Sequence, residues 1–465
     1  MKVNVAIIGA GSVNWMRNIM RDFFQIDEFE GGTLRLVDPK KDYVAAVREM
    51  LLNFCRLKKK DFKVDIFEDR REALAEADFV VCTFSPGSMD AFWYDLELPN
   101  IYGINLPVSM TVGIPGISAA IRTVPVAEEI VQDMEAVCPG AWLLSVTNPM
   151  TAVTTAYNRT AKTVKVVGMC HEIHALPSYL GPMLNLPKPE DMDIMTYLYK
   201  YLPEQGLDYT VAGINHFIWL TKATLKGEDM LPVIREYCAT HTECHADSIH
   251  HGFCENPLIN HGAAKLAMCR QFGYLPLAGD RHQVEFWPSL CNPRNGWGRK
   301  YGVDKTTVDS RRTGLEVSLA TVRRYAAATE ETMEWGMSGE EMCAIMRGIP
   351  TGTPVHSIVN MPNRSQIGNL PLGAVVETMS TITKEGIEPE FSGDMPGAIG
   401  SLCRLHLDVI DMVVRAALTG DRKLLVEAMT LDPSSANADF EDIPKLCDQL
   451  LEANRKYLPR FFNRT

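Results

Sequence analysis

The sequence lacks long apolar segments and any excess of positive charge. It contains no run of about 18 apolar residues, so we expect no transmembrane helix. Its start has too short an apolar run, and no small-residue cleavage site, for a secretory signal. The 46 Lys and Arg residues are outnumbered by 58 Asp and Glu residues, which gives a formal net charge of −12 at pH 7. Nonspecific binding to nucleic acid or to an anionic membrane needs a basic face, so we expect neither partner.

Internal repeats and low-complexity stretches are also absent, and cysteine does not form a disulfide framework. The 12 cysteines are spread over 465 residues, and several, such as Cys82 and Cys269, lie inside apolar segments. This usage is typical of reduced thiols, and we expect a cytoplasmic protein. The length favours two or three domains, and a hydrophobic content of 46% is enough for a large core.

Strands and helices alternate in the first part of the chain. Short apolar runs predict buried strands at Val3–Ile8, Leu34–Val37, Phe79–Phe84, Ala141–Val146 and Val164–Met169. Segments of helical period separate them, which predicts an α/β fold with a Rossmann-type, doubly wound parallel sheet. Ligands of such sheets bind beyond the carboxyl ends of the strands. The residues at those ends are Gly9, Asp38, Ser85, Asn148 and Cys170.

The pattern changes after residue 195. A strand predicted at Asp208–Ile214 runs into Asn215 and His216, and long amphipathic helices follow around Leu315–Trp335 and Leu405–Leu418. Residues 353–380 are rich in Val, Ile and Thr, which indicates a small antiparallel element. We therefore predict two domains, residues 1–195 and 196–465.

The turn after the first strand has the layout of a dinucleotide site. Gly9-Ala10-Gly11-Ser12 follows that strand, and Asp38 closes the next one. Glycines there let backbone N–H groups approach a pyrophosphate at a helix N-terminus, and the acid can accept from ribose hydroxyls. The third glycine of the usual fingerprint is missing, because position 14 is Asn. A plain glycine turn is the alternative. Asp38 favours NAD over NADP, because a carboxylate repels a 2′-phosphate.

Two strand ends carry side chains that bind transition metals. Cys170 and His216 each close a predicted strand, and a thiolate with an imidazole can hold a divalent ion. Ordinary buried core residues are the alternative. A later segment fits no standard zinc pattern and is interpreted as a polar loop. Its histidines and cysteines are His241, Cys244, His245, His250, His251, Cys254 and His261.

A dense group of ionisable residues lies beside an apolar stretch in the second half. Asp280, Arg281, His282 and Glu285 fall within six residues, directly after Gly279. Such charge density is consistent with an active-site loop or with a surface turn.

Taken in order, these motifs resemble the NAD- and manganese-dependent family 4 glycoside hydrolases, most of all the α-galacturonidase type. The matching segments span nearly the whole chain, which makes the ordered set specific although each motif alone is weak. They are Ala6–Ser12, Thr147–Pro149, Cys170–Ile173, Ala212–His216, Ala278–His282, Asn360–Asn363, Asn369–Pro371, Val375–Glu377 and Ala417–Asp421.

The resemblance implies a Rossmann domain followed by an α+β domain of the lactate and malate dehydrogenase superfamily, which binds substrate and metal and forms homodimers or homotetramers. It also implies a redox route to hydrolysis. NAD⁺ takes a hydride from C3 of the sugar, the ketone acidifies the C2 proton, and the aglycone leaves by elimination. Water then adds and NADH returns the hydride. A divalent ion, Mn²⁺ in the family, held by Cys170 and His216, would act as a Lewis acid.

The same resemblance assigns roles to individual residues. His171 assists the leaving group and Asp280 lies over the sugar. The residues expected to bind the dinucleotide are Gly9, Gly11, Ser12, Asp38, Ser85 and Asn148. Those expected to bind the sugar are Asn148, Glu172, Asn215, Arg281, His282 and Arg122.

The substrate class follows from the segment at the metal cysteine. Cys170-His171-Glu172-Ile173 resembles the α-galacturonidase version. Residues 89–94 contain no arginine, whereas phospho-glycosidases of the family place one there. We therefore expect an α-linked uronide, whose carboxylate needs a cation in bidentate reach. Arg281 or Arg122 could supply it.

One departure concerns the base that removes the C2 proton. The family's tyrosine corresponds to Phe272 here, and its acidic neighbour corresponds to Met110. Tyr274, which we take as the first candidate, His282 or His171 could replace the base. A sugar 3-dehydrogenase on the same scaffold, and a non-catalytic NAD-binding sugar sensor, are the alternative functions.

Overall fold

The structure, a computed structural model, describes residues 1–242 and 262–463. Of the His- and Cys-rich segment, His241 is described and the other six residues lie outside the described ranges. Among the described helices, none is both long enough and apolar enough to cross a membrane.

One sheet runs through the described chain in the order β10-β8-β7-β12-β11-β6-β5-β4-β1-β2-β3, with β13 on β12 and β9 on β8. Its first six strands are β1 (Lys2–Ile8), β2 (Gly31–Val37), β3 (Asp61–Phe67), β4 (Phe79–Cys82), β5 (Trp142–Ser145) and β6 (Lys165–Met169). They pair in parallel, in the order 3-2-1-4-5-6 found in Rossmann folds. The predicted α/β fold class is confirmed.

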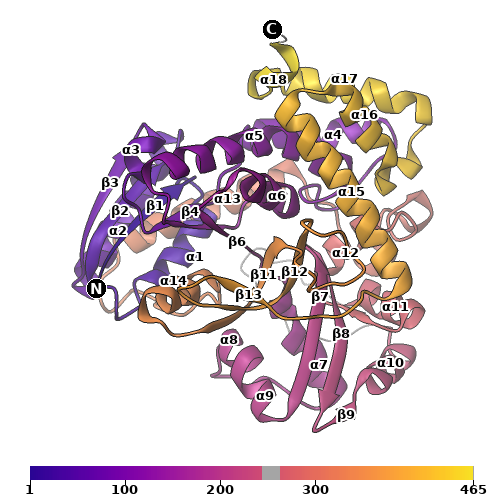
Figure 1. Ribbon diagram of the computed structural model, residues 1–465, viewed down its shortest axis with the longest axis horizontal. Helices are drawn as coiled ribbons and strands as arrows, with labels where there is room; N and C mark the ends of the chain where they lie inside the picture. Colours follow the sequence, from indigo (N-terminus) through magenta and orange to yellow (C-terminus); the bar gives the residue numbers. More distant parts are fainter. Residues whose placement is uncertain (243–261, 464–465) are drawn as a thin grey trace.

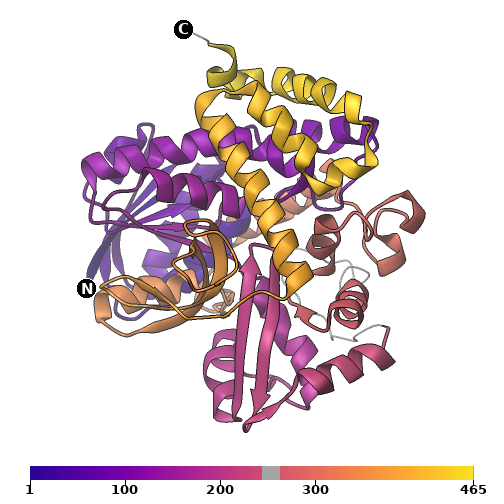
Figure 2. The same cartoon turned by 45° about the vertical axis from the view of Figure 1, so that its right-hand side comes forward.

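Seven further strands extend the sheet in antiparallel fashion. They are β7 (Leu207–Ile214), β8 (Phe217–Leu225), β9 (Glu228–Asp229), β10 (Leu275–Pro276), β11 (Val355–Pro362), β12 (Val375–Ile382) and β13 (Ile387–Pro389). The element predicted at residues 353–380 is the β11–β12 pair, which joins β6 on one side and β7 on the other. The sheet thus crosses the boundary predicted at residue 195, which itself stays a prediction. The β7–β8 hairpin extends toward the end of the molecule opposite the C-terminus (Figures 1 and 2).

Helices cover both faces of the parallel strands. The longer ones in the first half are α1 (Val13–Phe23), α2 (Lys41–Lys58), α4 (Ser88–Ile101), α5 (Gly113–Val137), α6 (Met150–Thr160) and α7 (Leu176–Leu184). Those in the second half are α10 (Leu231–Thr240), α11 (Ala263–Phe272), α12 (Asp280–Phe286), α13 (Val308–Ala326), α14 (Met342–Thr351), α15 (Gly397–Thr419), α16 (Arg422–Leu431) and α17 (Ile443–Ala453). Shorter pieces are α3 (Arg70–Leu74), α8 (Ile194–Thr196), α9 (Leu202–Glu204), α18 (Pro459–Phe462) and the single turn η1 (Glu172–Ala175).

Alternate residues of the parallel strands pack into two separate hydrophobic cores, one on each face of the sheet. Val5 and Ile7 of β1 pack with α1, α2, α13 and α14, whereas Ala6 and Ile8 pack with α5, α6 and the C-terminal helices. This alternation follows from the period of two in a strand. Helices from the second half of the chain therefore complete both faces of the Rossmann sheet, and Figure 1 shows α15 and α17 lying against α5 and α4.

The helix predicted around Leu315–Trp335 is wrong at its end, because α13 stops at Ala326. The Asn53 side chain of α2 donates to the carbonyls of Tyr325, at 2.8 Å, and Ala328, at 2.9 Å. These two bonds satisfy carbonyls that the helix end leaves without an intrahelical partner. The segment that follows leads to Glu340, which contacts His171.

Candidate active site

A cavity of about 1180 Å³ opens at the carboxyl ends of β1, β2 and β4. The predicted dinucleotide residues Gly9, Gly11, Ser12, Asp38 and Ser85 all line it. Asn148, which we expected there too, is not among its lining residues. The cavity lies where a doubly wound sheet binds its ligand.

Two glycines fix the backbone at the base of this cavity. Gly9 has a φ of +92°, and a Cβ there would lie 2.4 Å from the Thr83 carbonyl oxygen. The N–H of Gly11 donates to Asp38 at 2.8 Å, and the N–H of Lys40 donates to the other carboxylate oxygen at 2.8 Å. Asp38 is thereby held at the cavity wall, and a carboxylate has further lone pairs for ribose hydroxyls.

His216 occupies the tight turn between β7 and β8 and is held from several sides. Its φ is +61°, in the left-handed region that non-glycine residues rarely adopt. Its Nδ1 lies 2.7 Å from the hydroxyl of Thr111, and its ring stacks on the His282 ring with centroids 3.9 Å apart. Burial lowers the pKa of His216 to about 4, so the imidazole is neutral at neutral pH. Its Nε2 is the nitrogen left for a ligand.

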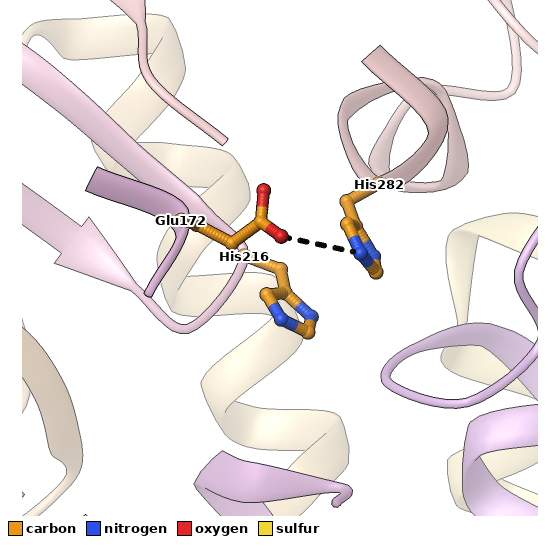
Figure 3. A group of neighbouring side chains, drawn as sticks. All are labelled: Glu172, His216 and His282. Carbon is orange, nitrogen blue, oxygen red and sulfur yellow. Dashed lines mark ion pairs between the residues drawn. The ribbon is translucent and has the colours of Figure 1, made fainter. Parts of the chain in front are cut away.

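Glu172 and His282 face this imidazole from two other elements. Glu172 opens the η1 turn after β6, and His282 lies on α12 (Figure 3). Glu172 Oε1 lies 3.6 Å from His282 Nε2, and Oε2 accepts from the Gly279 N–H at 2.5 Å. One donor atom each from Glu172, His216 and His282 lie within 4.8 Å of one another. The three side chains therefore converge on one small volume.

The charges of this group suit a divalent cation. Burial lowers the pKa of His282 well below its usual value, and the neighbouring His216 adds to the effect. Burial alone would raise the pKa of Glu172, but the three imidazoles around it and the Gly279 N–H keep it well below its usual value. An ionised carboxylate beside neutral imidazoles is the donor set that binds divalent transition ions. The residues present thus fit a metal.

Cys170 lies next to this group, against a buried polar network. Burial, together with Glu377 and Glu172, raises the pKa of the Cys170 thiol, while Asn215 bonds to its sulfur. Glu377 on β12 accepts from Asn360 at 2.8 Å and from Asn215 at 3.4 Å, and burial raises its pKa to about 7. Because these neighbours disfavour the charged form of the thiol, Cys170 ionises only when a cation lies nearby.

His171 is paired with a residue that the sequence did not indicate. Its Nδ1 lies 3.4 Å from Glu340, which precedes α14, and its ring lies against Trp15 of α1. Burial alone would lower the pKa of His171, but Glu340, with help from Glu172 and Glu377, raises it to about 9. His171 therefore carries a proton at neutral pH.

Two predicted residues of the second half occupy structural positions. Asp280 is 1% exposed, and its carboxylate accepts from the N–H groups of Ala264 and Lys265, both at 3.2 Å. These are the first turns of α11, whose N–H groups lack intrahelical partners. Arg281, which precedes His282 in the sequence, donates to the hydroxyl of Thr306.

Arg122, which was predicted to bind substrate, lies in a buried ion pair. Its guanidinium forms two bonds with the carboxylate of Asp95, at 2.8 and 2.6 Å, and further bonds with Ser118 and Asn454. Arg122 is 3% exposed and Asp95 1% exposed. This buried, fully bonded pair anchors α5 to α4 and leaves no donor for a sugar.

The residues that replace the family's base are also packed against neighbours. The ring of Phe272 stacks on Trp287 with centroids 4.9 Å apart, and the sulfur of Met110 lies 3.1 Å from the Arg311 guanidinium. Tyr274 is half-buried, with the Arg235 guanidinium 5.6 Å above its ring. None of these contacts involves Glu172, His216 or His282.

Sequence reasoning gave no role to Thr111 or Glu340, and it named Asn360 and Glu377 only as parts of matching motifs. Thr111 lies in the segment before α5, far from His216 in sequence, and Glu340 lies beyond the helix predicted around Leu315–Trp335. No local motif signals such partners, because each acts only through a contact made by folding.

The fold and the site together define a class: an α/β enzyme with a cavity at the strand ends of a Rossmann-type sheet and a group of side chains that could hold a metal ion. Residues 4–186 match the model of the family 4 glycosyl hydrolases, and residues 211–435 match the model of the family 4 glycosyl hydrolase C-terminal domain. The chain belongs to family 4 of the glycosyl hydrolases, which are hydrolases that act on glycosides.

Similar proteins agree along the full length. An alpha-galacturonidase of Thermoanaerobacterium saccharolyticum is 30% identical over 98% of this chain and 96% of its own length. One from Bacillus subtilis is 30% identical over 97% of each chain, and an alpha-galactosidase of the same organism is 26% identical over 98% and 99%. The crystal structure of lplD from Bacillus subtilis matches with a TM-score of 0.83 and 27% identity, over 97% of this chain and all of that one. A 6-phospho-alpha-glucosidase from gut microorganisms, in complex with NAD and Mn²⁺, shares the fold at a TM-score of 0.77 and 19% identity, over 99% of both chains.

Proposed function

We propose that this protein hydrolyses α-linked uronides, with α-galacturonides as the first class to test. NAD is the recycled cofactor and Mn²⁺ the divalent ion. The observation that carries the proposal is the full-length similarity to four alpha-galacturonidases at 29–30% identity, compared with 26% for an alpha-galactosidase and an alpha-glucosidase. The segment at Cys170, and the absence of arginine from residues 89–94, support the same class.

When bound, NAD supplies a hydride acceptor for C3 of the sugar, and the metal supplies a Lewis acid. The protein's own residues do the rest. His171, protonated beside Glu340, donates a proton to the departing glycosidic oxygen. Asn148, Asn215 and Glu172 bind sugar hydroxyls, and Arg281 forms a charge-assisted pair with the uronate carboxylate. Cys170 and His216 hold the metal, with Tyr274 as the candidate for removing the C2 proton.

We also propose that the protein is a homodimer or homotetramer.

The decisive experiment is a screen of nitrophenyl α-glycosides and α-uronides with NAD and Mn²⁺, in which released aglycone and NADH are read separately. We expect aglycone release from the α-galacturonide, no net NADH, and loss of turnover in a strong chelator. Cys170→Ser should weaken Mn²⁺ binding, because the soft ligand is lost.

Three results would contradict the proposal. Sustained NADH accumulation without aglycone would indicate a sugar 3-dehydrogenase, the alternative favoured by Phe272 and Met110 in place of the family's base. Uronide binding with neither product would indicate an NAD-binding sugar sensor. Full activity in chelator would remove the metal from the mechanism.

A further inference from the structure

Three oxygen and nitrogen donors from three separate elements meet beside Cys170. Glu172 comes from the turn after β6, His216 from the β7–β8 turn and His282 from α12 (Figure 3). The 3.6 Å between Glu172 Oε1 and His282 Nε2 is too long for a hydrogen bond. Donors that share one ion, each about 2.0–2.2 Å from it, lie roughly 2.8–3.6 Å apart at coordination angles of about 90–110°. The spacing is thus that of two ligands rather than of a bonded pair.

The backbone and one hydroxyl orient two of these donors. Thr111 binds Nδ1 of His216, which leaves Nε2 for a ligand, and the Gly279 N–H binds Oε2 of Glu172, which leaves Oε1. Partners of this kind hold metal ligands in place in metalloproteins. The Nδ1 atom of His282 is buried and has no hydrogen-bond partner among the described residues. Hydrogen bonding therefore does not account for the position of this ring, whereas its Nε2 faces the carboxylate.

We propose that Glu172 and His282 ligate the metal together with His216. With Cys170, the ion is then held by one thiolate, two imidazoles and one carboxylate before any sugar binds, and open positions remain for sugar oxygens. The inference rests on the proposed function only in that both concern the same ion. It moves Glu172 and His282, which the resemblance assigns to the sugar, to the metal beside Cys170 and His216, and it makes Mn²⁺ binding independent of substrate.

The first test uses the full-length protein with Mn²⁺ alone, without sugar or NAD, and follows free Mn²⁺ by electron paramagnetic resonance. Glu172→Gln and His282→Gln should each raise the Kd for Mn²⁺ by about tenfold or more. His356→Gln, at an exposed histidine on β11, is the matched control and should bind as the wild type does. NAD binding checks that each variant is folded, because the nucleotide cavity does not include these residues.

A second measurement needs no variant. Electron spin-echo spectroscopy of the Mn²⁺-loaded wild type should show two imidazole nitrogens coupled to the ion, and His282→Gln should reduce them to one. A single coupled nitrogen in the wild type, unchanged Kd values in both variants, or no Mn²⁺ binding without sugar would each overturn the proposal. If two nitrogens are found but no uronide is hydrolysed, the proposed function fails while this ligand set stands.

Discussion

The hydroxyl of Thr111 lies 2.7 Å from Nδ1 of His216, and both side chains are buried. This contact joins the segment before α5 to the β7–β8 turn. Neighbouring residues make parallel connections: the N–H groups of Val108 and Ser109 donate to Glu285 of α12 at 2.7 and 2.8 Å. The segment thus fixes the imidazole of His216, which we propose binds the metal, and the helix of His282 at the same time.

Replacing Thr111 by valine keeps the shape of the side chain but removes its hydroxyl. We expect Thr111→Val to weaken Mn²⁺ binding by roughly 10–100-fold, the usual effect of losing a partner that orients a metal ligand. Thr111→Ser restores the hydroxyl and should bind within a few-fold of the wild type. Titration of the purified protein with Mn²⁺ in a calorimeter measures both. Equal losses in the two variants would show that packing, not the hydrogen bond, is what His216 needs.

Arg281 offers a test of substrate charge. Arg281→Lys keeps the charge but loses bidentate hydrogen bonding to a carboxylate. This loss should weaken uronide binding by about 1.5–3 kcal/mol. This corresponds to a rise in KM of roughly 10–150-fold, and a neutral α-galactoside should be affected far less. Arg312→Lys, on the exposed side of α13, is the control. Equal losses on both substrates would exclude a carboxylate role for Arg281.

The absence of the family's base should appear in isotope effects. A well-placed base contributes roughly 10²–10⁴-fold, so removal of the C2 proton should limit the rate where Phe272 stands in its place. Deuterium at C2 should slow aglycone release more than deuterium at C3. If Tyr274 is the substitute base, Tyr274→Phe should lower release by a similar factor. Unchanged release in that variant would exclude Tyr274 as the base.

Asp22 predicts a pH dependence of stability away from the site. Burial raises the pKa of this carboxyl from 3.8 to about 6, although the N–H and hydroxyl of Ser338 donate to it. Because the folded-state pKa lies above the unfolded one, protonation favours the folded state, and the contribution is lost as pH rises through 6. A shift of this size corresponds to about 3 kcal/mol.

Asp22→Asn removes the titrating group and keeps an acceptor for the Ser338 N–H. Relative to the wild type, its free energy of unfolding in urea should therefore increase by about 3 kcal/mol between pH 4 and pH 7. Asp309→Asn, at an aspartate whose side chain is 93% exposed, should show no such trend. A constant difference between Asp22→Asn and the wild type across this range would contradict the assignment.

The parallel strands could be predicted because burial on both faces makes each a continuous apolar run. β3 (Asp61–Phe67) was not predicted. It is the outermost strand of the parallel part, and the charged residues Asp61, Lys63 and Asp65 interrupt its apolar positions. The strand ends located Gly9, Asp38, Ser85 and Cys170 in advance, because parallel strands bring their carboxyl ends to one edge.

Partners from distant segments could not be predicted in the same way. Arg122 has the chemistry to bind a carboxylate, and only the fold shows that the carboxylate is Asp95. Likewise Glu340 meets His171 because the Asp22 carboxylate binds the Ser338 N–H, which fixes the segment before α14 against α1. Such contacts depend on tertiary packing, and no local pattern in the sequence reports them.

The continuity of the sheet has a consequence for synthesis of the chain on the ribosome. β6 ends at Met169, but its neighbour β11 begins only at Val355, so 185 residues lie between the open strand edge and its partner. At typical elongation rates that interval lasts roughly 10–40 s. During that time the nascent Rossmann half presents an unpaired apolar edge, a known template for aggregation. Expression of residues 1–195 alone should therefore give an insoluble product, and folding of the complete protein should benefit from chaperones that shield that edge.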